Sequence, residues 1–86
     1  MAIAEQIIKV VVVSVHSRGG YSRHVIRVVQ CRSDQRGYRS ERGVRVLATY
    51  GPFYRVRTAS GRGKGPDAYR EATAYAEQLR LEALGV

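Results

Sequence analysis

Two runs of β-branched residues in the first third of the chain predict two neighbouring strands. Residues 7–16 read IIKVVVVSVH and residues 24–32 read HVIRVVQCR. Valine and isoleucine have few side-chain rotamers and favour extended backbone, and both runs are short for a helix. The Gly19-Gly20 pair between them favours a hairpin turn. Both runs are apolar at odd and even positions, which is typical of strands that are covered on both faces.

Two further strands are predicted over residues 43–49 and 53–59, where apolar and polar side chains alternate. The sequence YGP separates them. A three-residue connection that pairs Thr49 with Phe53 places the apolar side chains of both strands on one face, whereas a two-residue turn mixes them with arginines. We therefore predict that register, with Pro52 in the connection, where its missing N–H is harmless.

Residues 66–84 predict the one helix of the chain. Pro66 is tolerated in a first helical turn, Asp67 suits the positive end of the helix dipole, and Gly85 is a typical residue after a helix end. Helical periodicity brings the small and aromatic side chains of this segment onto one stripe, which we expect to pack against the sheet. The stripe contains Ala68, Tyr69, Ala72, Tyr75, Ala76, Leu79 and Ala83.

The predicted fold is therefore α+β: one domain, residues 1–86, with a four-stranded antiparallel sheet in β-β-β-β-α order and the helix packed on one face. One helix covers only one face of a sheet, so the second apolar face of the first hairpin needs another cover. A homodimer is one answer, because a two-fold contact uses the same patch twice. The alternative is a sheet that curls around its own long loop, residues 32–43.

The charge of the chain is strongly asymmetric. The formal net charge is +8; residues 66–86 contain two basic and four acidic side chains, and residues 1–65 contain thirteen basic and three acidic ones. Such a basic surface attracts phosphate polymers, anionic lipids or acidic proteins. No apolar run is long enough for a membrane span, and no signal peptide is evident. The single cysteine, Cys31, predicts a buried thiol and a reducing, cytoplasmic setting.

Two loops of similar composition are the first candidate binding elements. Residues 17–23 read SRGGYSR and residues 35–42 read QRGYRSER. Arginine contacts phosphates, tyrosine offers a face on which an unpaired base stacks, and glycine lets backbone approach closely. The alternative is a pair of solvated, flexible loops. The candidates here are Arg18, Tyr21, Arg23, Arg36, Tyr38, Arg39 and Arg42.

The predicted fourth strand and the glycine-rich segment after it are the second candidate. Neighbouring arginines on one strand face have a spacing comparable to that of successive phosphates. Residues 61–65, GRGKG, lead into the helix start, where backbone donors and the helix dipole favour an anion. The segment lacks the Gly-Lys-Ser/Thr ending of a nucleotide-hydrolysing loop. The candidates on this face and segment are Arg45, Phe53, Arg55, Arg57, Arg62 and Lys64.

Residues 53–79, FYRVRTASGRGKGPDAYREATAYAEQL, resemble the end of a double-stranded RNA-binding domain, in which a strand and a glycine-rich turn precede a helix with alanines facing the sheet. This resemblance covers about a third of the chain. Pro66, Asp67 and Tyr69 stand where that family has a lysine cluster, and the family's N-terminal helix is not predicted. The predicted element order is also similar to that of small dimeric single-strand DNA binders of the Whirly and positive-coactivator types, a similarity of architecture alone.

The sequence thus predicts a non-catalytic nucleic-acid-binding protein, for which single-stranded DNA or RNA is favoured over duplex because no recognition helix is evident. One alternative is a small phage or mobile-element inhibitor, such as an anti-CRISPR protein, whose arginines bind an acidic host-protein surface. A second is a ribonuclease that uses His16 and His24, which the first hairpin could bring together. No cofactor is predicted, and the spacing of histidines and cysteine gives no metal site.

Overall fold

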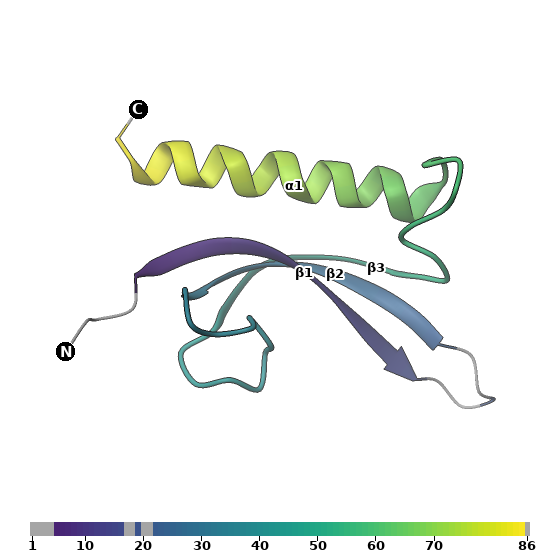
Figure 1. The fold of residues 1–86 in the computed structure, drawn as a ribbon, viewed down its shortest axis with the longest axis horizontal. Coiled ribbons are helices and arrows are strands. Elements are labelled where there is room, and N and C mark those ends of the chain that lie inside the picture. Colours follow the sequence, from purple (N-terminus) through teal and green to yellow (C-terminus); the bar gives the residue numbers. More distant parts are fainter. Residues whose placement is uncertain (1–4, 17–18, 20–21, 86) are drawn as a thin grey trace.

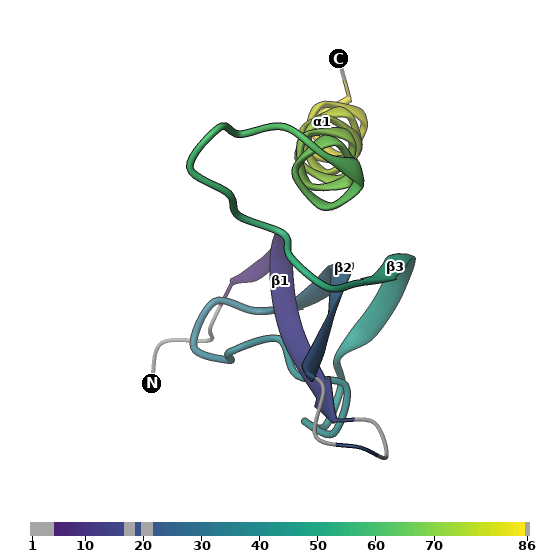
Figure 2. The same cartoon turned by 90° about the vertical axis from the view of Figure 1, so that its right-hand side faces the viewer.

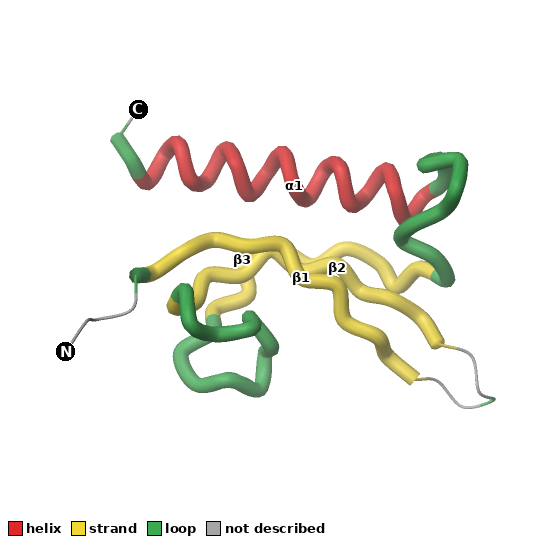
Figure 3. Tube along the Cα trace, in the orientation of Figure 1, coloured by secondary structure: helices red, strands yellow, loops and turns green. Residues whose placement is uncertain are grey.

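The computed structural model describes residues 5–16, 19 and 22–85. Strands β1 (Gln6–His16), β2 (Ser22–Arg32) and β3 (Arg45–Phe53) form an antiparallel sheet in the order β1-β2-β3, and helix α1 (Lys64–Ala83) crosses one face (Figures 1 and 2). Loops and turns join these elements, as the secondary-structure colouring in Figure 3 shows. No helix within the described residues is long and apolar enough to cross a membrane.

The prediction of four strands is wrong, because the YGP sequence lies inside β3 and does not form a turn. Beyond this point β3 still pairs with β2, through Phe53 and His24. Between the pairs Ile26–Tyr50 and His24–Phe53, β3 advances three residues while β2 advances two, so β3 has a bulge here. Because β3 is an edge strand, its bulge accommodates Pro52 without breaking an inner ladder. The predicted pairing of Thr49 with Phe53 does not occur.

Residues 54–63 form no strand and connect β3 to the helix. In Figure 2 this connection leaves β3, passes over the sheet towards β1 and then rises to α1. Tyr54 is exposed and Val56 is buried, so the alternation in the sequence reflects a single buried anchor in an irregular segment. A short alternating pattern does not distinguish these two cases.

The core lies between the sheet and α1. Ile26 and Val28 of β2, both fully buried, pack with Val56 and with the buried alanines of the helix: Ala68, Ala72 and Ala76. The predicted helix stripe is confirmed except at Ala83, which is exposed. Small side chains let α1 approach the sheet closely. Gly65 is the tightest point, since a Cβ built there would lie 1.8 Å from the backbone oxygen of Arg55.

The opposite face of the sheet is covered in part by the β2–β3 loop, residues 33–44 (Figures 1 and 3). Gly37 of this loop is buried, and a Cβ built on it would meet Val11 and Val29 at 3.0 Å. The Nζ of Lys9 donates a hydrogen bond to the backbone oxygen of Gln35 (2.7 Å). Cys31 is fully buried, as predicted. The chain's own loop therefore covers part of the second apolar face, for which a homodimer was one of the two predicted covers.

Candidate nucleic-acid interface

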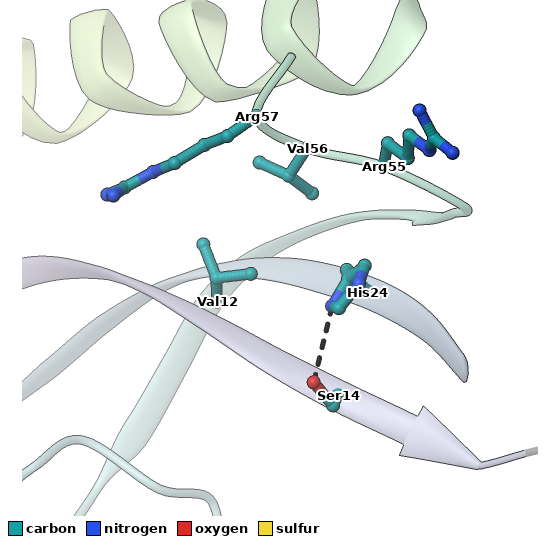
Figure 4. A pocket seen from close by; sticks show the side chains of 6 residues that line it. All are labelled: Val12, Ser14, His24, Arg55, Val56 and Arg57. Atoms are coloured by element: carbon teal, nitrogen blue, oxygen red, sulfur yellow. Dashed lines mark hydrogen bonds between the residues drawn. The ribbon is translucent and has the colours of Figure 1, made fainter. Parts of the chain in front are cut away.

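A groove of about 410 Å³ opens on the helix side of the sheet, between the first hairpin and the connection after β3. We call it the helix-side groove. The two strands of the hairpin, β1 and β2, form its floor, and the connection after β3 forms its upper wall (Figure 4). Its lining residues are Val12, Ser14, His24, Arg55, Val56 and Arg57.

The floor of this groove follows from strand alternation. Even-numbered residues of β1 and β2 point towards the helix, and Ser14 lies directly opposite His24 in the register. The Ser14 Oγ and the His24 Nδ1 are 3.2 Å apart and share a hydrogen bond, drawn in Figure 4. Val12, which is 40% exposed, supplies the apolar part of the floor. The groove floor therefore combines an imidazole and a hydroxyl with one apolar side chain.

The upper wall is held by Val56, whose buried side chain points down towards Val12 (Figure 4). Because Val56 is anchored, its two neighbours project outward, and the side chains of Arg55 and Arg57 extend in opposite directions along the groove. Both arginines are exposed. They are therefore not stacked on one strand face at phosphate spacing, as the fourth-strand prediction required, but flank the groove at two points.

Two arginine–tyrosine pairs involve residues that line the groove or are next to such residues in the chain. The Arg23 guanidinium carbon lies 5.1 Å from the centroid of the Tyr54 ring, and its Nη2 donates a hydrogen bond to the Tyr54 hydroxyl (3.3 Å). The Arg57 guanidinium lies 5.8 Å from the Tyr69 ring centroid. Such contacts orient the guanidinium groups at low cost. Tyr54 is 65% exposed, so one aromatic surface remains accessible next to the basic groups.

Tyr54 was missed from the sequence because the predicted fourth strand placed it on the core face. Phe53, which was predicted to stack on bases, is instead half-buried against the core. Strand register alone could not predict that Tyr54 is exposed and Phe53 half-buried, because this depends on where β3 ends. Of the first loop's candidates, Arg23 is described and pairs with Tyr54, whereas Arg18 and Tyr21 lie outside the described residues.

The glycine-rich segment brings two more exposed basic side chains, Arg62 and Lys64, to the helix start. The first helical turn itself is packed inward, since Gly65 and Pro66 are buried. The carboxylate of Asp67 forms an ion pair with Arg70, which also donates to the backbone oxygen of Gly61. The helix start therefore offers side-chain cations and not an open cradle of backbone donors.

The second arginine–tyrosine loop is a folded structure stabilised by Glu41. Its carboxylate accepts hydrogen bonds from the backbone N–H groups of Gly37 and Tyr38, both at 2.7 Å, and of Arg36 at 3.4 Å. These backbone donors, that of Tyr38 first, lower the pKa of Glu41 below its ordinary value. An internal anion thus occupies the donors that a phosphate would need. The side chains of Arg36, Tyr38, Arg39 and Arg42 remain exposed.

Comparisons of this chain with protein-family models, with curated proteins and with solved structures found no match.

The histidines show no further catalytic partner in the described part of the chain. The Nδ1 atoms of His16 and His24 each share a hydrogen bond with a cross-strand serine, Ser22 at 3.3 Å and Ser14 at 3.2 Å. Among residues 5–16, 19 and 22–85, no group of three or more His, Cys, Asp or Glu side chains is placed to hold a metal ion. What the groove itself offers chemically is therefore two cations, a hydroxyl group and an imidazole group, with the exposed Tyr54 ring outside its lining.

Proposed function

We propose that this chain is a non-catalytic nucleic-acid-binding protein and that the helix-side groove, with Tyr54 beside it, is its contact surface. The observation that carries the proposal is that Arg55 and Arg57 line one groove, while Arg23 pairs with the exposed Tyr54 ring next to Arg55 in the chain. Guanidinium groups suit phosphate oxygens, and a tyrosine ring suits an unstacked base. No described residue lining the groove is acidic.

A single strand fits this surface better than a duplex does. Bases of a single strand can turn towards Tyr54 while their phosphates meet the arginines, whereas the bases of a duplex are stacked inside it. The helix does not offer a basic recognition surface, because it contains four acidic and three basic side chains. The single, buried Cys31 agrees with the reducing, cytoplasmic setting that we include in the proposal.

The test is a fluorescence-anisotropy titration of a labelled 15-nucleotide dT or rU strand with the full chain at increasing salt. With three arginines on phosphates, the slope of log K against log salt is expected to be about −2, and Arg55→Gln with Arg57→Gln makes it shallower by about 1.4. Tyr54→Ala is expected to weaken binding by about 5- to 150-fold, the equivalent of one lost base stack.

The matched control is Arg32→Glu, which lowers the net charge by two, as the double Gln variant does. Arg32 pairs with Asp34 at 3.3 Å outside the groove. Equal losses in the control and in the double variant would mean that only the total charge of the chain matters. If neither single nor double strands bind at low salt, the proposal is wrong, and recovery of an acidic protein from nuclease-treated lysate would favour the inhibitor alternative.

A further inference from the structure

A second basic cleft lies on the face of the sheet opposite the helix. It has a volume of about 310 Å³ and is lined by Arg27 of β2, Arg39 of the β2–β3 loop, and Val46 and Thr49 of β3. Arg27 is directly opposite Thr49 in the register, so both belong to this face. Sequence reasoning missed Arg27, although it is the one charged residue within the apolar run VIRVVQC. We call this site the loop-side cleft.

The loop that completes the cleft is held by buried polar contacts. The side chain of Gln35 is buried; its Oε1 accepts from the N–H of Arg32 (2.9 Å), and its Nε2 donates to the backbone oxygen of Arg42 (2.7 Å). Glu41 binds three further backbone amides of the same loop. Arg39 is therefore presented by an ordered segment, which reduces the entropy lost when a ligand binds.

The two sites cannot serve one straight segment of nucleic acid. His24 and Arg27 are three residues apart on one strand, so their side chains project from opposite faces of the sheet. Figures 1 and 3 show the same division, with the connection to the helix on one side of the sheet and the β2–β3 loop on the other. The exposed arginines of the loop, Arg36 and Arg42, add to the charge on the loop side.

We propose that the loop-side cleft is a second site for the phosphate backbone, so that one molecule holds two strands at once and promotes their annealing. This inference rests on the proposed function of the helix-side groove. Two bound strands have a high effective concentration relative to each other, and arginines between them reduce the repulsion of their phosphates. Arg27 and Arg39 are assigned to the second strand, and Arg55 and Arg57 to the first.

The experiment measures energy transfer between two non-complementary 15-nucleotide dT strands, one labelled with a donor and the other with an acceptor, with the chain below the total strand concentration. The wild type is expected to give transfer, and Arg27→Gln with Arg39→Gln to lose it while single-strand affinity stays within about threefold. The single variant Arg39→Gln is expected to lose part of the energy transfer. It changes only an exposed side chain and leaves the half-buried Arg27 in place. With complementary strands, the double variant anneals at the protein-free rate.

The control is again Arg32→Glu, which has the same change in net charge and is expected to retain transfer. The inference is overturned if the Arg27 and Arg39 variant gives wild-type transfer, or if the wild type binds one strand tightly and gives no transfer. Failure of the proposed function looks different, because then the wild type binds no strand in the anisotropy titration either.

Discussion

Replacing Gly65 by alanine tests how the helix start holds the wall of the helix-side groove. Gly65 lies in the first turn of α1, where alanine has a higher helix propensity by up to about 1 kcal/mol. The contacts predict instead that alanine destabilises the fold. A Cβ at this position would lie 1.8 Å from the Arg55 backbone oxygen and 2.9 Å from the Val56 Cα, and backbone atoms cannot rotate away as a side chain can.

The expected cost is about 3 kcal/mol, at the upper end of the range for overpacking. A domain of this length has a total stability of about 4 to 13 kcal/mol, so the loss is a large fraction of it. In thermal unfolding followed by circular dichroism, the expected decrease in Tm is about 12 to 24 °C. Because the contact is with residues 55 and 56, the variant also displaces Arg55, and its affinity for the labelled strand should fall.

The control for Gly65→Ala is Gly61→Ala, in the same glycine-rich segment. Gly61 has a positive φ of 66° but no atom within 4 Å of a built Cβ, so only backbone strain of about 1 kcal/mol is expected. If Gly65→Ala is as stable as the wild type, or is more stable, the close packing of the helix start on residues 55 and 56 is refuted.

Three further results are expected. Ile26→Ala creates a cavity in the core and should cost about 2 to 5 kcal/mol in denaturant unfolding, whereas Val12→Ala, at a site 40% exposed, should cost much less. Backbone hydrogen bonds to the ionised Glu41 carboxylate lower its pKa and stabilise the fold at pH values above the ordinary value of 4.5. This stabilisation is lost as the pH falls through the lowered pKa, so Glu41→Gln should flatten the fall of Tm below about pH 4.5. The buried thiol of Cys31 should react with a thiol reagent only at the rate of unfolding, and fast native-state reaction would contradict its burial.

The first two strands and the helix could be predicted from the sequence because each has a long, regular pattern: continuous β-branched residues in the strands and one stripe of small and aromatic residues in the helix. Eleven paired positions join β1 and β2 without a bulge, and the helix stripe repeats through several turns. The extent of β3 could not be predicted in the same way. It contains bulges on both sides of the segment from Ala48 to Tyr50, and each bulge adds a residue that shifts the two-residue period. Alternation counted across a bulge assigns side chains to the wrong face.

The arginines could be selected from the sequence as candidates, but their arrangement into a site could not be predicted. Of the arginines selected from the sequence, Arg55 and Arg57 line one groove, and Arg23 pairs with Tyr54 next to Arg55 in the chain. The second arginine–tyrosine loop, whose arginines were also selected, folds against the other face of the sheet. The reason is the contact of Gly37 with Val11 and Val29, a long-range contact that no local pattern reports.

The path of residues 54–63, which do not form the predicted fourth strand, also explains why the groove exists. A fourth strand beside β3 would have kept Arg55 and Arg57 at the far edge of the sheet, away from β1. The connection instead crosses over the sheet, and burial of Val56 holds it above Val12 and His24 (Figures 2 and 4). Because Val56 belongs to the same buried cluster as the helix alanines, the energy that stabilises the helix on the sheet also fixes the positions of the two arginines. The groove is therefore a consequence of core packing, which fixes the backbone that carries the two arginines before any ligand binds.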